Sequence, residues 1–252
     1  RDLRMSRGLG DVYKRQNLCS VSRLFFTLVS SAVSFHSTGN RMITLYTWTT
    51  PNGRKASIML EELGIPYQVR TINIGKDEQF APSFLAISPN NKIPAIVDED
   101  AEGGPLPIFE SGAILTYLAE KHGRFLDASG PTRYKTLEWL HWQIGGLGPM
   151  LGQLGFFGVR SKDKSPLAID RFVEESDRLL TVMDKQLASS TYLAGDDYTI
   201  ADIACYPWTI AATTYLKDVL VDSLATKPSV HRWLQTVGER PAVQRGMAVP
   251  KI

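Results

Sequence analysis

The chain has little cysteine and no long hydrophobic run. Two cysteines in 252 residues are too few for a disulfide framework or a Cys-rich zinc site. No apolar run reaches the roughly 18 to 20 residues of a bilayer-spanning helix, so we expect no integral membrane protein. A charged fraction of 21 %, with 20 glycines and 14 prolines, excludes a disordered, collagen-like or low-complexity chain. No internal repeat is present, and the length suits a globular chain of one or two domains.

Charge is spread unevenly along the chain. Residues 1–41 hold seven basic and two acidic side chains, a net charge of +5. The whole chain has 28 basic and 26 acidic residues. Residues 42–252 therefore contain 21 basic and 24 acidic residues, a net charge of −3. The overall charge of +2 therefore combines two unlike segments, and we expect no nucleic-acid partner.

Residues 1–41 have the composition of a leader rather than of a packed domain. Residues 17–41 are rich in serine, contain no acid and include the apolar stretch LFFTLV, which suits a secretory signal or an organelle transit peptide. Residues 1–16, RDLRMSRGLGDVYKRQ, instead resemble a translated library adapter ahead of a start at Met42. We favour an adapter followed by untranslated leader sequence, non-native or disordered, with organelle targeting as the alternative.

Residues 42–123 alternate between strand-like and helix-like patterns. β-Branched and aromatic residues and polar–apolar alternation predict strands at 43–48, 67–74, 92–97 and 106–109. Apolar residues at helical spacing predict a helix from about Pro51 to Gly64, a short one around Phe84 and a third at 110–122. A βαβ unit followed by two strands and a helix predicts a small α/β layer with a mixed sheet.

A helical domain follows at residues 132–252. Residues 123–131, with two glycines, a serine and a proline, have the composition of a linker. Apolar residues at helical spacing after it predict an all-α bundle. Thr199 and Asp202 predict a capping box at one helix start. The glycines and proline of 139–153 are unusual in a helix and suggest close packing or a kink beside a cleft.

The turn between the first strand and the first helix is a candidate anion site. It reads TTPN at 49–52. A helix N-terminus offers free N–H groups and a positive dipole, which stabilise anions such as a thiolate, and Thr50 or Asn52 can donate a hydrogen bond there. The alternative is that Thr50 only caps the helix, with Pro51 in its first position.

Two further stretches suit a peptide-like ligand. Proline at a strand start often fixes a bend, sometimes through a cis peptide, so Pro94 would leave the backbone of Ile93 free to pair with a ligand. Glu110 suits an ammonium group, and the Ser111 hydroxyl at a helix start suits a carboxylate. An ordinary turn at 88–94 and an ordinary cap at Ser111 are the alternatives.

The sequence contains no motif for a metal site, a serine nucleophile or a phosphate-binding loop. The histidines at 122, 141 and 231 lack metal-ligand spacing, so we expect no metal. Neither a GxSxG motif nor a Gly-rich phosphate loop is present. Cys205 lies in an apolar helical stretch, and we expect a buried, inert thiol.

Five ordered blocks resemble the cytosolic glutathione transferase superfamily, and most closely its nu class. They are YTWTTPNGRKASIMLEE, QFAPSFLAISPNNKIPAIVD, FESGAILTYLAEK, WLHWQIGGLGPMLGQ and YTIADIACYPW. The resemblance implies a thioredoxin-like α/β domain followed by an all-helical domain. It also implies a homodimer, and we expect a cytoplasmic protein.

The resemblance implies that glutathione supplies the reactive sulfur. A thioredoxin carries Cys-x-x-Cys where this chain reads TTPN, so the protein has no nucleophilic thiol at that turn. Thr50 would then hydrogen-bond the glutathione sulfur, and Asn52 would support the same site.

The remaining glutathione contacts are also implied by the resemblance. Gln79 would contact the glycyl end, and the Ile93 backbone would pair with the cysteinyl part beside a cis Pro94. Glu110 and Ser111 would hold the γ-glutamyl group, and Arg171 would reach the ligand region.

The implied activity is that of a glutathione-dependent disulfide-bond oxidoreductase with weak transferase or peroxidase activity. A bound glutathione thiolate would attack a disulfide, and a second glutathione would resolve the mixed disulfide. The alternatives are a conventional transferase that conjugates glutathione to electrophiles and a non-catalytic glutathione-binding regulatory domain.

Overall fold

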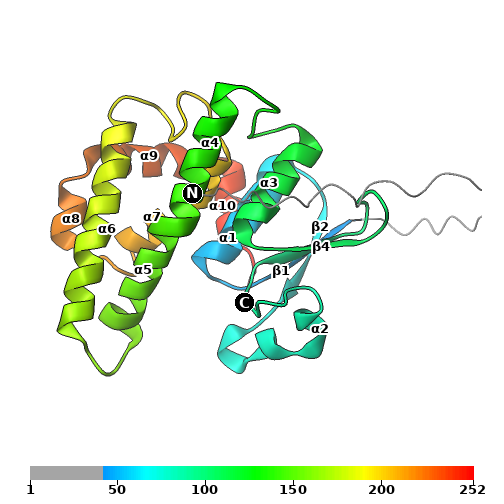
Figure 1. Ribbon diagram of the computed structural model, residues 1–252, viewed down its shortest axis with the longest axis horizontal. Helices are drawn as coiled ribbons and strands as arrows, with labels where there is room; N and C mark the ends of the chain where they lie inside the picture. Colours follow the sequence, from blue (N-terminus) through cyan, green and yellow to red (C-terminus); the bar gives the residue numbers. More distant parts are fainter. Residues whose placement is uncertain (1–41) are drawn as a thin grey trace, which may run out of the picture. The chain divides into compact units, whose positions relative to one another are not determined.

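A computed structural model describes residues 42–252 (Figure 1). The predictions for residues 1–41 concern a segment outside the described residues. Residues 42–252 belong to one compact unit, so the division into domains 42–123 and 132–252 stays a prediction. Among the described helices, none combines the length and the apolar character of a membrane span.

The first part of the unit is a four-stranded sheet with the order β2-β1-β3-β4. The strands are β1 (Ile43–Thr47), β2 (Tyr67–Thr71), β3 (Ala95–Asp98) and β4 (Leu106–Phe109). β1 pairs in parallel with β2 and antiparallel with β3, which pairs antiparallel with β4, so the predicted mixed sheet is confirmed. β3 begins later than predicted, directly after Pro94, because proline has no N–H to donate to the ladder.

Successive side chains of β1 point to opposite faces of the sheet. Leu45 is fully buried on the face covered by α1 (Pro51–Leu63) and α3 (Ser111–His122), which pack against each other. Tyr46 points to the opposite face and contacts Phe84 of α2 (Pro82–Leu85), with ring centroids 6.1 Å apart. Between β2 and α2 run two short 3-10 helices, η1 (Ile74–Lys76) and η2 (Glu78–Phe80).

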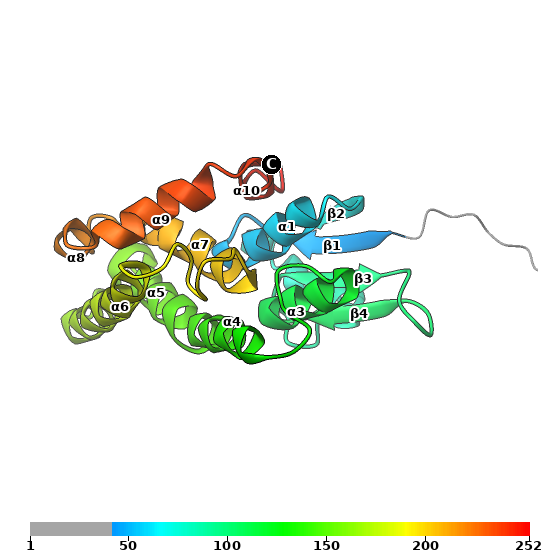
Figure 2. The same cartoon turned by 90° about the horizontal axis from the view of Figure 1, so that it is seen from above.

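Helices make up the second part of the unit (Figures 1 and 2). Its helices are α4 (Pro131–Trp142), α5 (Gly148–Leu154), α6 (Pro166–Leu187), α7 (Ile200–Thr213), α8 (Val221–Ala225), α9 (Pro228–Gly238) and α10 (Pro241–Met247). Two π-helical turns, η3 (Gln143–Leu147) and η4 (Gly155–Arg160), precede and follow α5. A thioredoxin-like sheet followed by an all-helical part confirms the predicted fold class.

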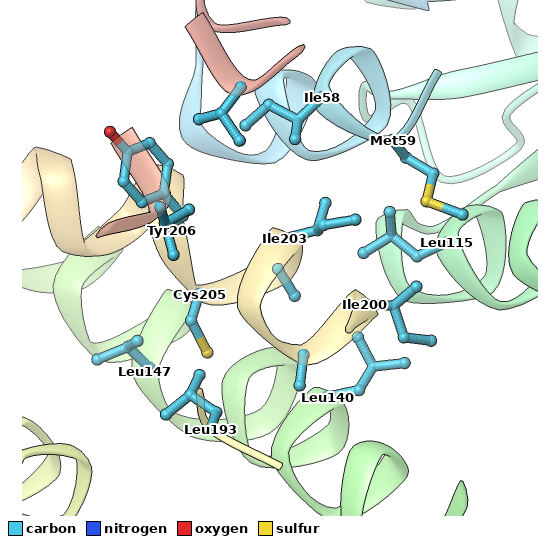
Figure 3. Close-up of a cluster of buried hydrophobic side chains, with 14 of the residues drawn as sticks. Ile58, Met59, Leu115, Leu140, Leu147, Leu193, Ile200, Ile203, Cys205 and Tyr206 are labelled. Carbon is cyan, nitrogen blue, oxygen red and sulfur yellow. The ribbon is translucent and has the colours of Figure 1, made fainter. Parts of the chain in front are cut away.

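The main core joins the two parts. Figure 3 shows side chains of α1, α3, α4 and α7 packed together, among them Met59, Leu115, Leu140 and Ile203. Cys205 lies inside this cluster and is fully buried. The helix that begins at the candidate site is therefore fixed by side chains from both parts of the unit.

The predicted capping box at the start of α7 is confirmed. Thr199 caps the helix, and Asp202 Oδ2 accepts a hydrogen bond from the backbone N–H of Thr199 at 3.0 Å. The carboxylate of Asp202 also accepts from the backbone N–H of Leu193 at 3.0 Å and from Trp233 Nε1 at 2.9 Å. Asp202 thus joins the start of α7 to the preceding loop and to α9.

α10 packs directly on α1. Ser57 Oγ donates to the backbone carbonyl of Gly246 at 2.7 Å. Arg240, which precedes α10, donates to both carboxylate oxygens of Glu62, at 2.6 and 2.8 Å. A segment far along the chain therefore covers one side of the first helix.

Candidate functional site

Thr50 is the N-cap of α1. Its backbone is extended, and its Oγ1 accepts a hydrogen bond from the backbone N–H of Gly53 at 3.2 Å. The capping interpretation is therefore observed, with Pro51 at the start of the helix. An accepting hydroxyl keeps its own hydrogen, so Thr50 remains able to donate to an anion in front of the helix.

The first turn of α1 requires a residue without a side chain. A Cβ atom on Gly53 would lie 2.3 Å from the carbonyl oxygen of Trp48 and 2.5 Å from Thr47 Oγ1. The strand end and the helix start therefore approach too closely for any other residue. This tight turn fixes the position of the helix N-terminus relative to the sheet.

Asn52 is oriented by a residue from the helical part. Its Oδ1 accepts a hydrogen bond from Trp208 Nε1 of α7 at 2.8 Å. The indole N–H is only a donor, so this contact assigns the amide oxygen to Trp208 and leaves the Asn52 NH₂ group to donate elsewhere. A side-chain donor and the helix N–H groups thus lie at the same end of α1.

Ile93 and Pro94 form the bend before β3. Their peptide bond is cis, as the family resemblance implied. Within residues 42–252, the backbone N–H and C=O of Ile93 have no hydrogen-bond partner. A donor and an acceptor of the main chain are therefore available beside the start of α1.

Glu110 and Ser111 lie at the start of α3. Glu110 is exposed and has a positive φ of 69°, a conformation that non-glycine residues rarely adopt and that is often found at functional sites. Its Oε1 accepts from Asn90 Nδ2 at 3.5 Å. Ser111 is buried and opens the helix. A carboxylate and a hydroxyl therefore both lie at the start of α3.

A pocket of about 290 Å³ brings most of the predicted residues together. It is lined by Asn52, Lys92, Ile93, Pro94, Phe109, Glu110 and Ser111. Thr50 lies two residues before Asn52 at the same helix end. Lys92, which the sequence did not single out, places an exposed cation at this pocket.

Gln79 and Arg171 are not among the residues that line this pocket. Gln79 lies on η2; its Nε2 is 3.4 Å from Asp77 Oδ1, and its buried Oε1 has no hydrogen-bond partner within the described chain. Arg171 lies on α6 with a 65 % exposed side chain and faces Glu175 at 4.0 Å. Their predicted ligand contacts stay predictions.

A second, smaller pocket of about 160 Å³ adjoins the first and shares Asn52, Glu110 and Ser111 with it. Its other lining residues are Lys55, Gln143, Ile144, Gly148, Pro149 and Trp208. A Cβ atom on Gly148 would lie 2.6 Å from Gln143 Nε2 and 3.2 Å from Trp208 Nε1. Close packing beside a cleft, one of the two possibilities that the glycine-rich stretch 139–153 suggested, is therefore observed at Gly148, directly after the π-turn η3.

Sequence reasoning missed three residues of this second pocket. Lys55 has a signal in the sequence, because it lies on the apolar face of α1, four residues before Met59. Gln143 lies in the stretch 139–153 that suggested a cleft, but no pattern in the sequence places it or Trp208 next to α1. Trp208 donates a hydrogen bond to Asn52, which the sequence did predict, and Gln143 accepts one from Lys55, which lies one turn after Asn52.

Cys205 cannot act in either pocket in its observed position. Its side chain is fully buried, and burial raises the pKa of the thiol well above its usual value. A neutral, enclosed thiol is a poor nucleophile. The prediction of a buried, unreactive Cys205 agrees with this environment.

The chain belongs to the glutathione S-transferase family. The model of the glutathione S-transferase N-terminal domain matches residues 49–121, and that of the C-terminal domain matches residues 148–241. Disulfide-bond oxidoreductase YfcG of Escherichia coli is 49 % identical over 208 residues, which are 82 % of this chain and 94 % of that protein. Disulfide-bond oxidoreductase YghU of the same organism is 44 % identical over 221 residues, 84 % of this chain and 76 % of that protein.

Solved structures agree with this assignment. A glutathione transferase from Pseudomonas putida, with one glutathione disulfide bound per subunit, superposes with a TM-score of 0.81 at 43 % identity, over 85 % of this chain and 94 % of that one. A family member from Pseudomonas fluorescens with two glutathione molecules bound has a TM-score of 0.78 at 44 % identity, over 84 % and 95 % of the two chains.

Proposed function

We propose that this chain is a glutathione-dependent disulfide-bond oxidoreductase. The observation that carries the proposal is a pocket that gathers hydrogen-bond donors at the N-terminus of α1 and offers no thiol of its own. Within the described residues, the free cysteine is the buried Cys205. The reactive sulfur therefore comes from the ligand. The likeness to YfcG and YghU supports the same reaction.

The start of α1 would stabilise the glutathione thiolate. The Thr50 hydroxyl and the Asn52 amide are the two side-chain donors there, and the helix dipole adds a positive field. Together they lower the pKa of the bound thiol and raise its thiolate fraction at neutral pH. A moderate shift serves best, because a thiolate of very low pKa is also a weaker nucleophile.

The pocket offers a partner for each part of the tripeptide. The unpaired backbone groups of Ile93, next to the cis Pro94, would pair with the cysteinyl residue. Glu110 would accept from the γ-glutamyl ammonium group, and Ser111 would donate to its carboxylate. Lys92 supplies a cation at the edge of the pocket.

Two residues from outside the pocket lining complete the proposed site. Gln79 would reach the glycyl end, and its unpartnered Oε1 supports a ligand contact there. Arg171 would have to leave Glu175 and turn toward the ligand region.

The reaction is two successive thiol–disulfide exchanges. The bound glutathione thiolate attacks one sulfur of the substrate disulfide, a glutathione–substrate disulfide forms, and the other substrate sulfur leaves as a thiolate that takes up a proton. A second glutathione thiolate then attacks the glutathione sulfur, releasing the remaining substrate thiolate and forming glutathione disulfide. Two glutathione molecules are oxidised for each disulfide reduced.

The proposal is tested by steady-state reduction of 2-hydroxyethyl disulfide, with glutathione disulfide formation coupled to a reductase. We expect turnover by the chain, and a higher kcat/KM for this disulfide than for conjugation of a chlorodinitrobenzene-type electrophile. Faster conjugation would favour the conventional transferase. Glutathione binding without turnover on either substrate would favour a regulatory domain.

We further propose a cytoplasmic homodimer. Support for self-association comes from exposed apolar side chains on β4 and α4, among them Phe109 at 37 % and Tyr134 at 65 % exposure. Light scattering on the purified protein measures its mass, and a monomeric mass over the working concentration range contradicts the dimer. Cell fractionation of the expressed chain tests the compartment.

A further inference from the structure

Lys55 is a buried cation beside the proposed glutathione site. It lies one turn after Asn52 in α1, and its side chain is 1 % exposed. Its Nζ donates to Ser111 Oγ at 3.3 Å and to Gln143 Oε1. Lysine is rarely so buried without an acidic partner, yet no ion pair within residues 42–252 includes Lys55. Within the described residues, Lys55 therefore has hydrogen bonds to neutral side chains but no ion pair.

The contact with Lys55 determines what the Ser111 hydroxyl can do. An ammonium group only donates hydrogen bonds, so Ser111 Oγ accepts from Lys55 and its own hydrogen is left to donate. Ser111 lines both pockets and is the first residue of α3, where helix N–H groups also favour an anion. A carboxylate in the pocket would thus meet a hydroxyl donor with a cation directly behind it.

The charged and titratable groups around Lys55 come from α3 and α7, while the facing residue of η3, Gln143, is neutral. Burial lowers the pKa of Lys55 to about 7, and the charges of Cys205 and Glu110 act in the opposite direction. The Cys205 thiol stays neutral, because burial raises its pKa well above the usual value. Glu110 is therefore the acidic residue whose charge favours the protonated form of Lys55.

Gln143 holds Lys55 in place from the helical part. It is fully buried in the π-turn η3, and its Oε1 accepts from Lys55. Its Nε2 has no hydrogen-bond partner within the described chain, so the contact with Lys55 is the hydrogen bond of this amide there. The cation behind Ser111 is thus fixed from the other side of the pocket.

We propose that Lys55 is a positioning residue for glutathione, holding Ser111 as a donor to the γ-glutamyl carboxylate and acting as the buried counter-charge of that carboxylate. The inference rests on the proposed glutathione site and extends it. A bound carboxylate adds a second negative charge near Lys55 and favours its protonated form. Ligand binding is therefore coupled to proton uptake when Lys55 is neutral in the free protein.

The test is calorimetric titration with S-methylglutathione, which keeps the γ-glutamyl group but has no thiol to ionise. We expect Lys55→Met to weaken binding about tenfold or more, as for a lost hydrogen bond to a charged group. Ser111→Ala should weaken it by a similar factor. The double variant should bind only slightly more weakly than the weaker single variant, since both changes remove one interaction.

Proton linkage gives a second readout that a merely structural lysine would not change. Titrations at about pH 8 in buffers of different ionisation enthalpy measure the protons taken up on binding. The native protein should take up most of one proton more than Lys55→Met. Lys227→Met is the matched control, because Lys227 is also buried but pairs with Asp177 at 3.0 Å in the helical part; it should bind S-methylglutathione and take up protons like the native protein.

Three outcomes would contradict the inference. Unchanged binding by Lys55→Met, losses that add fully with Ser111→Ala, or equal proton uptake in both proteins would each overturn it. If Lys55→Met does not fold, Lys55→Gln, which keeps a neutral donor, should still lose the proton uptake, and retained uptake overturns the inference. A native protein that does not bind S-methylglutathione contradicts the proposed function instead.

Discussion

The indole Nε1 of Trp208 donates a hydrogen bond to Asn52 Oδ1 over 2.8 Å and joins α7 to the first turn of α1. Trp208 thereby decides which end of the Asn52 amide faces the pocket. The helical part of the unit thus contributes to the thiolate site although it does not supply the thiolate's own donors.

We expect Trp208→Phe to reduce disulfide reductase activity, because the Asn52 amide can then rotate and turn its oxygen toward the thiolate. The loss should be about five- to tenfold in kcat/KM, with a rise of roughly half to one unit in the pKa of bound glutathione. The pKa is measured from thiolate absorbance against pH. Trp142→Phe on α4, outside the lining of both site pockets, is the control and should leave both values unchanged.

Thr50→Ala should reduce both stability and activity. The lost cap costs about 1 kcal/mol in the free energy of unfolding, and the lost hydroxyl donor raises the pKa of the bound thiol. Thr199→Ala removes the comparable cap of α7 and should lower stability without changing that pKa. An unchanged activity in folded Thr50→Ala contradicts the role of Thr50.

Cys205→Ala should keep the disulfide reductase activity. The thiol is fully buried in the apolar core, so the substitution leaves a small cavity and costs roughly 1 kcal/mol of stability. Denaturant unfolding and the reductase assay measure the two effects separately. A folded variant without activity would mean that the protein's own sulfur takes part in the reaction.

Lys55 should give the free protein a stability that increases with pH. Burial lowers its pKa to about 7 from 10.5, so between these values the unfolded chain binds the proton that the native protein has lost. Stability from this group therefore rises from about pH 7 toward pH 10. Lys55→Met should lack this rise and be more stable than the native protein near pH 7, as measured by urea unfolding at each pH. A parallel pH dependence in both proteins contradicts the assignment.

Asp202→Ala should be among the most destabilising changes. The carboxylate accepts from two backbone N–H groups and from Trp233 Nε1, and all three donors would lose their partner inside the protein. The expected loss is about 3 kcal/mol or more in the free energy of unfolding, measured in denaturant. Asp222→Ala, in the first turn of the exposed end of α8, should cost much less.

The sequence predicted the parts of the site that are local in the chain. Thr50, Pro51 and the helix start follow from short-range capping rules, and the bend at Pro94 follows from the missing N–H of proline. The mixed sheet and the capping box at Thr199 follow from patterns of a few residues as well. Assigning glutathione to these residues required the family resemblance, since each pattern alone also fits an ordinary turn or cap.

The contacts between distant segments were not predictable in this way. Nothing in the sequence near Asn52 indicates Trp208, and nothing near Ser111 indicates Lys55. Helical spacing places Lys55 on the buried face of its helix, but an isolated lysine on such a face is usually assumed to reach solvent. The sequence also does not indicate that the stretch 139–153 contains a π-turn that begins at Gln143.

The packing of α10 on α1 has a consequence for synthesis on the ribosome. α1 is translated early, but Gly246, the acceptor for Ser57, is added about 190 residues later, and Arg240, the partner of Glu62, only shortly before it. During that interval the side of α1 that packs against α10 in the folded protein has no partner. The nascent thioredoxin-like part therefore completes its contacts with α10 only after residue 246 has emerged from the exit tunnel.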